Sequence, residues 1–248
     1  MAEVLLVTGA SRGIGAATAK LAAQRGYAVA VNYATNREAA DSVVRAITQA
    51  GGRALAVHGD VAKEEQILSM FDTVDRALGR LTALVNNAGV IDVTQRVDEM
   101  TSARMKRMFD INVLGSILCA REAVKRMSTK HGGQGGAIVN VSSAASRLGA
   151  PGQYVDYAAA KGAIDAFTLG LAKEVAAEGI RVNAVRPGLI ETDIHASGGI
   201  PDRVRQLAHL VPMQRGGSAE EVAESIVWLL SKQASYVTMS LLEVSGGR

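Results

Sequence analysis

The chain contains a single cysteine, Cys119, so no disulfide can form within it, and we interpret this thiol as a small buried helix residue. The four histidines are scattered along the sequence, and neither a CxxC nor an HExxH motif occurs. A zinc site therefore has no ligand set.

Neither sign of charge dominates, because 27 basic and 24 acidic residues are interspersed along the chain. This balance does not indicate a nucleic-acid partner. No apolar run approaches the ~18 residues that a membrane span requires. The opening residues, MAEVLLVTGA, lack the basic region of a secretory signal. We therefore expect a cytoplasmic protein with no membrane partner.

The chain does have enough length, 248 residues, and enough hydrophobic content, 48%, to bury a large core as one domain over residues 1–248. Short β-branched runs alternate with longer segments of helical spacing. The expected strands are Val4–Thr8, Ala28–Tyr33, Ala54–His58, Leu81–Asn86, Ala137–Ser142, Ile180–Val185 and Leu241–Val244. The expected helices are Ile14–Arg25, Glu38–Ala50, Glu64–Leu78, Ala103–Met127, Val155–Glu178 and Ala219–Ser231. This alternation predicts an α/β fold with a seven-stranded parallel sheet covered on both faces.

The connection at about 189–211 is unusually long and has no strand signal. Long connections in compact domains are usually lids or binding loops, so we expect this one to cover a substrate site. His195, His209, Arg203 and Arg205 lie in it and are candidate contacts for an acid or phosphate, although such side chains are more often simply solvated.

The glycine-rich sequence TGASRGIG follows the first expected strand and opens a helix. Glycines at 9, 13 and 15 allow a tight turn and close approach of a ligand, and the unpaired N–H groups of the helix attract an anion. The turn predicts a pyrophosphate site. The candidate contacts are Gly9, Ser11, Arg12, Gly13, Ile14 and Gly15. A strand-to-helix turn without a ligand is the alternative.

The end of the second strand indicates which dinucleotide is preferred. An acidic residue there binds a free ribose 2′-hydroxyl, whereas a basic residue pairs with a 2′-phosphate. This chain has Asn32 and Tyr33 in place of an acid, and Arg12 and Arg37 lie nearby in sequence. NADP(H) is therefore predicted to be preferred, with NAD(H) possible, unless both arginines are ordinary surface charges.

Tyr157 and Lys161 are four residues apart and share one face of the expected helix. An ammonium beside a phenol favours the phenolate, so we expect Lys161 to lower the pKa of Tyr157 and to make it a proton carrier. Taken alone, a tyrosine and a lysine at this spacing are far more often an ordinary surface pair.

Several short motifs occur together in a fixed order: TGASRGIG at 8–15, NNAG at 86–89, Asn112, Ser143 with YAAAK at 157–161, and RPG at 186–188. Over essentially the whole chain they resemble the short-chain dehydrogenase/reductase family, especially bacterial members of the glucose 1-dehydrogenase and 3-oxoacyl-[acyl-carrier-protein] reductase types. The resemblance implies a single-domain Rossmann-type three-layer α/β/α sandwich. Because family members pair through the two long helices and the last strand, it also implies a homotetramer or homodimer.

The resemblance also implies roles for individual residues. Tyr157 would be the acid/base, Lys161 would bind the nicotinamide ribose, Ser143 would hold the substrate oxygen, and Asn112 would complete a proton relay. For Asn112, a polar residue that only kinks its helix is the alternative. The further cofactor contacts implied are Asp60, Val61, Asn86, Ala88, Gly89, Pro187, Gly188, Ile190 and Thr192. For Thr8 and Asn87 the alternative is a structural role that ties neighbouring strands and turns together, and for Asn87 we expect that role at least as strongly as direct cofactor contact.

Three features depart from the family pattern. Ser143 precedes Tyr157 by one residue more than is usual, with the extra residue between Gly152 and Tyr157, so Ser142 is the alternative serine. Met239 replaces a common glycine, which implies a changed backbone or a refilled gap. Glu178 replaces a basic residue found in reductases that act on acyl-carrier protein, and a carboxylate there would repel an acidic carrier. A basic patch formed by Lys125, Arg126 and Lys130 is the alternative contact for an acidic carrier, so this substrate class is disfavoured but not excluded.

These observations predict an NADP(H)-preferring oxidoreductase that interconverts a secondary alcohol and a ketone or aldehyde on a small-molecule substrate. The alternatives are a 3-oxoacyl-[acyl-carrier-protein] reductase and a non-catalytic dinucleotide-binding sensor.

Overall fold

The computed structural model describes residues 3–192, 198–200 and 202–248. Its sheet has seven strands in the order β3-β2-β1-β4-β5-β6-β7, and every neighbouring pair is parallel, which confirms the predicted fold class. The strands are β1 Val4–Val7, β2 Ala28–Tyr33, β3 Arg53–His58, β4 Ala83–Asn86, β5 Gly136–Val141, β6 Ile180–Pro187 and β7 Leu241–Val244.

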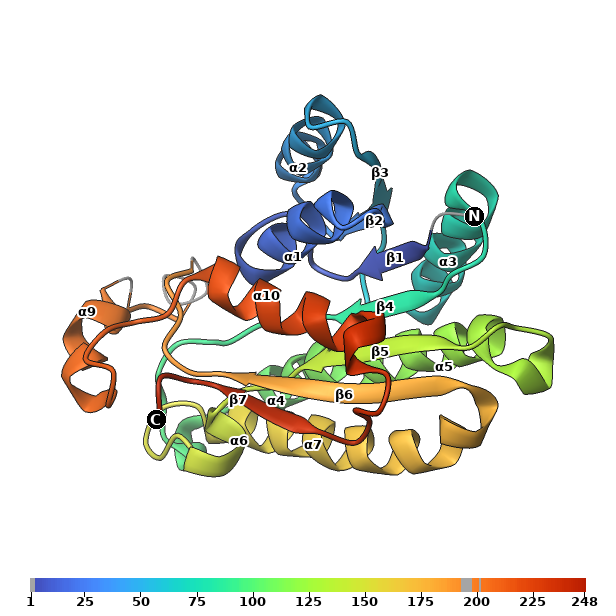
Figure 1. Ribbon diagram of the computed structural model, residues 1–248. Coiled ribbons are helices and arrows are strands. Elements are labelled where there is room, and N and C mark those ends of the chain that lie inside the picture. The colour runs from blue at the N-terminus through green and yellow to red at the C-terminus, as the bar shows by residue number, and fades with distance from the viewer. Residues whose placement is uncertain (1–2, 193–197, 201) are drawn as a thin grey trace.

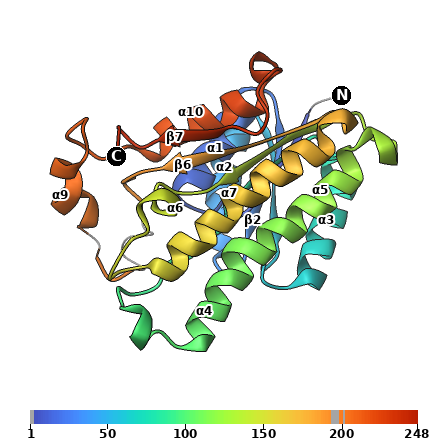
Figure 2. The ribbon, with the colours of Figure 1, turned by 90° about the horizontal axis from the view of Figure 1, so that it is seen from below.

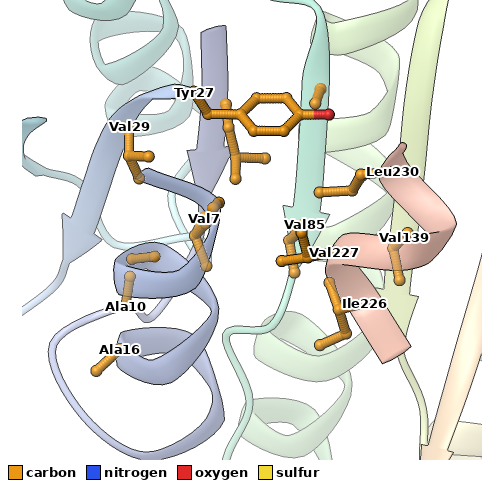
Figure 3. Packing of buried hydrophobic residues seen from close by; sticks show 14 of the residues in the cluster. Val7, Ala10, Ala16, Tyr27, Val29, Val85, Val139, Ile226, Val227 and Leu230 are labelled. Carbon is orange, nitrogen blue, oxygen red and sulfur yellow. The ribbon is translucent and has the colours of Figure 1, made fainter. Parts of the chain in front are cut away.

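Helices cover both faces of the sheet (Figures 1 and 2). One face carries α1 Gly13–Gln24, α2 Arg37–Gln49 and α10 Ala219–Leu230, and the other carries α3 Glu64–Leu78, α5 Gly115–Met127 and α7 Val155–Val175. Successive strand residues point to opposite faces, so Leu5 and Val7 enter the first core while Val4 and Leu6 enter the second. Figure 3 shows α10 packing Ile226 and Val227 into the first core.

The segment expected as one helix over Ala103–Met127 is interrupted. It forms α4 Ser102–Phe109, a π-helical turn at Asp110–Leu114, and α5. The Asn112 side chain donates to the Met108 carbonyl at 3.1 Å and so competes with the regular helical bonding. One such turn shifts the helical repeat by only about one residue, which is too little to be recognised in the hydrophobic spacing of the segment.

Other boundaries also differ from the expected ones. The helix expected to end at Glu178 ends at Val175 and continues as a 3₁₀ turn, Ala176–Glu178, which Gly179 closes with a φ of +80°. Two short helices were not predicted, α6 Ala145–Leu148 and α9 Arg203–Leu207, because each is too short to show a helical repeat. The remaining 3₁₀ turns are Val97–Glu99, Thr129–His131, Ala208–Leu210 and Lys232–Ala234.

Met239 keeps the backbone that a glycine would have there. Its φ is +64°, its N–H donates to the Val182 carbonyl at 2.7 Å, and its side chain is exposed. The turn at this position thus has the left-handed backbone that favours glycine, and within the single chain the methionine side chain is exposed.

Within the part of the chain that the structure describes, no helix has both the length and the apolar character to cross a membrane. In the long connection after β6, residues 193–197, with His195, and residue 201 lie outside the described residues. Cys119 is a buried residue of α5, as predicted, and burial raises the pKa of its thiol to about 12.

Candidate active site

A cavity of about 480 Å³ lies at the carboxyl ends of the central strands. The ends of β5 and β6, the start of α7 and Ile14 of the first turn all contribute to its wall. In open parallel sheets, ligands bind at this edge where the strand order reverses, which here falls between β1 and β4. A larger hollow of about 1310 Å³ lies at the amino ends of the strands, but Ser143, Tyr157 and Lys161 all line the smaller cavity.

The glycines of the first turn are required by its packing against the loop after β4, and the start of the helix that follows is open to a ligand. Gly9 has a φ of +61°, and a Cβ there would lie 2.9 Å from the Ala88 Cα. A Cβ on Gly15 would lie 2.5 Å from the Asn87 amide nitrogen. Helix α1 has no side-chain cap, because its N-cap residue Arg12 makes no such bond, so its first N–H groups are open to an anion. These features fit the diphosphate of a dinucleotide.

Asn32 holds this turn from within the protein. It is buried, its Oδ1 accepts from Gly9 N at 3.0 Å, and its Nδ2 donates to the Gly59 carbonyl at 2.9 Å. The ring of Tyr33 packs edge-on against His58, with 5.5 Å between ring centres. The side chain of Asn32 is thus already used by the protein, a structural role that its position in sequence did not reveal.

The two arginines considered for nucleotide choice are both exposed. Arg12 is not paired with any described acid, and Arg37 lies 3.5 Å from Asp41 on the same helix. Exposed pairs of this kind contribute little to stability, so both guanidinium groups are accessible to an anionic partner.

The loop after β4 is tied to its neighbours. Asn86 is buried and its Nδ2 donates to the Ser116 carbonyl and to Asn140 Oδ1, both at 3.0 Å. Asn87 donates to the carbonyls of Thr8 and Gly9 at 2.9 and 3.0 Å, which confirms its predicted structural role. The Asn86 side chain likewise joins strands and is directed away from the cavity.

The remaining residues expected at the cofactor lie around the same edge. Ala88 packs on Gly9, and a Cβ on Gly89 would lie 2.7 Å from Asn112 Oδ1. Asp60 Oδ1 accepts from Ala62 N at 3.0 Å, and Val61 is buried. The segment after β6 reaches back to the first turn, where a Cβ on Gly13 would lie 3.4 Å from the Thr192 methyl group. Pro187, Gly188, Ile190 and Thr192 all line the cavity.

Tyr157 and Lys161 enter the cavity from the first turns of α7. The Lys161 ammonium lies 5.6 Å from the centre of the Tyr157 ring and donates to the Val141 carbonyl at 2.7 Å. The Ser142 hydroxyl donates to the Lys161 carbonyl at 3.2 Å, whereas the Ser143 hydroxyl lies at the Tyr157 phenol. Of the two serines, Ser143 is therefore the one beside Tyr157.

The connection from α6 to α7 turns tightly just before the segment in which the extra residue is expected. Gly149, Ala150 and Gly152 all have positive φ values there, 75°, 45° and 69°. The tight turns leave Tyr157 in the cavity. The nearby Tyr154 hydroxyl is instead directed at the Gly198 carbonyl, 3.5 Å away.

Burial sets the titration of this pair. It raises the pKa of the Tyr157 phenol, although the hydrogen bond with Ser143 acts in the opposite direction. It lowers the pKa of Lys161 to about 8, with the Asp165 carboxylate opposing the shift. The expected net lowering of the Tyr157 pKa is therefore wrong. The cause is that desolvation of the phenol dominates and the ammonium is directed at the Val141 carbonyl.

The side chain of Asn112 is bound within the protein. Its Oδ1 accepts from Val90 N and its Nδ2 donates to the Val90 carbonyl, both at 3.0 Å. These bonds join the π-helical turn to the loop after β4, close to Lys161, since a Cβ on Gly89 would lie 3.6 Å from Lys161 Nζ. The structure thus shows the helix-distorting role that was left as the alternative, and a relay through Asn112 stays a prediction.

A buried ion pair, which sequence reasoning missed, fixes the start of α7. Arg104 Nε donates to Asp156 Oδ2 at 2.8 Å, and the side chains are only 7% and 4% exposed. Asp156 Oδ1 also accepts from Tyr157 N at 2.9 Å. The pair therefore joins α4 to the residue that carries the phenol.

Two further cavity residues come from the end of the chain and the long connection, Arg248 and Arg203. Arg203 was a candidate from sequence, but no signal pointed to Arg248. His209 and Arg205 are exposed, and Arg205 lies 3.5 Å from Asp202.

The lowered pKa of Lys161 predicts a pH dependence of stability. The folded protein releases this proton near pH 8, whereas the unfolded chain keeps it until about 10.5, so the unfolded chain binds more protons in between. The free energy of unfolding should therefore rise through this window by up to about 3 kcal/mol relative to Lys161→Met. Urea unfolding from pH 7.5 to 10.5 measures the difference. The exposed Lys173→Met is the control, and a difference constant with pH would contradict the assignment.

Comparisons with known proteins agree with this arrangement. The family model described as enoyl-(acyl carrier protein) reductase matches residues 9–248. An uncharacterized oxidoreductase of Escherichia coli, YgfF, is 59% identical over 99% of both chains. The cis-4-hydroxycyclohexanecarboxylate dehydrogenase of Sinomonas cyclohexanicum is 42% identical, covering 99% of this chain and 96% of its own. A solved short-chain dehydrogenase/reductase from Serratia marcescens superposes with a TM-score of 0.91 at 33% identity, over 99% of this chain and 97% of that one.

Proposed function

The chain belongs to the short-chain dehydrogenase/reductase family, and from this premise we propose that it is an NADP(H)-preferring oxidoreductase that interconverts a secondary alcohol and a ketone or aldehyde. One observation carries the proposal. Tyr157, Ser143 and Lys161 line one cavity that also reaches the glycine turn through Ile14. A proton donor, an oxygen-binding hydroxyl and a cation thus meet beside a turn suited to a diphosphate.

A reduced nicotinamide, when bound, would supply the hydride to the substrate carbon. The Ser143 hydroxyl holds the carbonyl oxygen by donating a hydrogen bond, and the Tyr157 phenol donates its proton to the same oxygen. The carbonyl thereby becomes an alcohol, with the hydride on its carbon and the proton from Tyr157 on its oxygen. Oxidation of the alcohol returns the proton to the tyrosine oxygen. Because burial raises the pKa of Tyr157, the phenol keeps its proton at neutral pH, which favours carbonyl reduction.

Lys161 uses one of its three N–H groups on the Val141 carbonyl, which fixes the ammonium at the wall of the cavity. We propose that its remaining donors hold the nicotinamide ribose. Below about pH 8 the ammonium also stabilises the phenolate that remains after proton donation. Pro187, Gly188, Ile190 and Thr192 are the proposed contacts of the carboxamide, and the 189–211 connection is the proposed substrate cover.

The assignment to a small substrate, in place of an acyl-carrier protein, is supported by the charges near Glu178. Its carboxylate accepts from the Ser128 hydroxyl and adds negative charge. The nearby Arg126 is surrounded by Asp72, Asp75 and Glu122, and Lys125 pairs with Glu122 at 2.8 Å. These acids neutralise most of the basic patch that an acidic carrier would require.

Assembly as a homotetramer or homodimer stays a prediction. It is supported by apolar residues left on the surface where α4 meets α5, because Phe109 is 40% exposed and Leu114 is 48% exposed.

Turnover with a panel of ketones and aldehydes tests the proposed function, with oxidation of NADPH and NADH followed by absorbance. We expect kcat/KM to be at least about tenfold higher with NADPH. Replacing both Arg12 and Arg37 with methionine should lower kcat/KM for NADPH by about 10–100-fold and leave NADH little changed, because charged hydrogen bonds to the 2′-phosphate are lost.

Arg25→Met is the matched control, since Arg25 is an exposed arginine just after α1 that pairs with Glu224. It should change neither cofactor's kinetics. Equal use of NADPH and NADH by the wild-type protein would contradict the nucleotide preference. Tight cofactor binding without turnover of any carbonyl would instead favour a dinucleotide sensor.

A further inference from the structure

Two arginines meet at the substrate end of the cavity, away from the glycine turn. The Arg203 guanidinium lies over the Tyr154 ring, 5.2 Å from its centre, and donates to Gln153 Oε1 at 2.6 Å. Arg248 is held beside α6, where Arg147 donates to its main-chain oxygen at 3.0 Å. Figure 1 shows the C-terminus beside α6, with α9 on the same side of the molecule.

Neither guanidinium group has an acidic side chain as its partner. Among the described residues, no aspartate or glutamate lines the cavity, and none forms a salt bridge with Arg203 or Arg248. Burial lowers the pKa of Arg248, and the charge of Arg203 lowers it further. The two cations are thus close enough to repel each other.

Most other shielded arginines in the chain are neutralised. Arg104 pairs with Asp156, and Arg186 pairs with Asp165 at 2.8 Å and Glu243 at 3.0 Å. Arg126 has three acidic partners, and Arg181 donates to main-chain carbonyls of α10. Against this pattern, Arg203 and Arg248 are two cations without an acidic side-chain partner among the described residues, and both line the cavity that contains the proposed reaction site.

We propose that Arg203 and Arg248 bind an oxyanion group of the substrate, a carboxylate or a phosphate monoester, at the end remote from the reacting carbon. Arginine forks suit both groups because each presents paired oxygens to parallel N–H donors. The cofactor diphosphate is a poor candidate for this place, because the arginines adjoin Gln153, Tyr154 and α6 while the glycine turn lies at the start of α1. This inference rests on the proposed function and names its substrate class.

The test compares ketones that differ only in charge. The probes are 4-oxopentanoate, 5-oxohexanoate and 4-oxocyclohexanecarboxylate, each beside its methyl ester, together with dihydroxyacetone phosphate beside dihydroxyacetone. We expect kcat/KM with NADPH to be at least about tenfold higher for one class of anion than for its neutral partner. A preference for the acids assigns a carboxylate, and a preference for the phosphate assigns a phosphate monoester.

Variants locate the preference. Arg203→Met and Arg248→Met should each raise KM for the anion about tenfold or more and leave the neutral partner nearly unchanged, and Arg248→Lys should restore part of the loss. Arg205→Met is the matched control, since Arg205 lies two residues along α9 and its side chain is 84% exposed. Equal kcat/KM for anions and neutral partners, or a preference that survives the double variant, would overturn the proposal.

A binding measurement separates this proposal from the proposed function. Calorimetry with cofactor-saturated Tyr157→Phe measures binding of the same acids, esters and phosphate without turnover. Anion binding that is lost in Arg203→Met/Arg248→Met supports the oxyanion site even if no probe is reduced by the wild-type protein. If the neutral ketones are reduced but no anion binds more tightly than its neutral partner, the oxyanion site is wrong and the proposed function stands.

Discussion

Replacement of Tyr157 with phenylalanine is expected to lower kcat by about 10²–10⁴-fold, because it removes the proton that the proposed reaction delivers to the substrate oxygen. The ring, its burial and its contact with the Lys161 ammonium are all retained. Binding of NADPH should therefore change little. Steady-state reduction of the best ketone measures kcat, and calorimetry measures cofactor binding.

Tyr154→Phe is the control, because Tyr154 is a buried tyrosine of the same cavity. Its hydroxyl makes a long and therefore weak hydrogen bond of 3.5 Å to the Gly198 carbonyl. Removal of this hydroxyl should change kcat by less than a few-fold, since the ring that supports Arg203 remains. Comparable losses in both variants would show that the cavity tolerates neither change, and an unchanged kcat in Tyr157→Phe would eliminate the acid/base assignment.

Removal of Asp156 is expected to have the largest effect on stability. Asp156→Ala leaves the Arg104 guanidinium buried without its carboxylate, which should destabilise the protein by about 3–5 kcal/mol. It also removes the acceptor of the Tyr157 N–H, so activity should fall even where the protein remains folded. Urea unfolding at neutral pH measures the loss in the free energy of unfolding. The value of kcat, measured at urea concentrations well below those that unfold the variant, measures the effect on the position of Tyr157.

A neighbouring ion pair with an exposed lysine provides the control. Lys106 of α4 lies 2.5 Å from Asp110 of the π-helical turn, and Lys106→Met should cost no more than about 0.5 kcal/mol. The double variant Arg104→Met/Asp156→Leu should recover most of the lost stability, because no unpaired charge stays buried. A double variant as unstable as Asp156→Ala would contradict this account.

The fold was predictable because its strands carry unbroken apolar runs. In β2, Val29 and Val31 enter one core and Ala28 and Ala30 enter the other. Both faces of this part of the strand are therefore apolar, and the run is recognisable in the sequence as a buried parallel strand. The interruption at Asp110–Leu114 was not predictable, because it depends on hydrogen bonds from Asn112 to Met108 and to the distant Val90. Spacing along one helix carries no information about such a partner.

The candidate site was predictable to the extent that its residues follow one another at fixed intervals. Tyr157 and Lys161 share a helix face and lie together as expected. The direction of the Tyr157 pKa shift depended on burial, which the sequence alone does not give. Arg248 was missed because its place beside Arg203 results from the path of the last strand and has no local pattern.

Asn32 also constrains how nucleotide choice can evolve or be engineered in this protein. Its amide spans from the Gly9 N–H to the Gly59 carbonyl, so an aspartate there would keep the acceptor but lose every donor and place charge against carbonyl oxygens. An Asn32→Asp substitution is therefore not a suitable way to change the nucleotide preference toward NADH. A change at Tyr33 or at the surface arginines would not break the hydrogen bonds that Asn32 makes to the glycine turn, the proposed dinucleotide site.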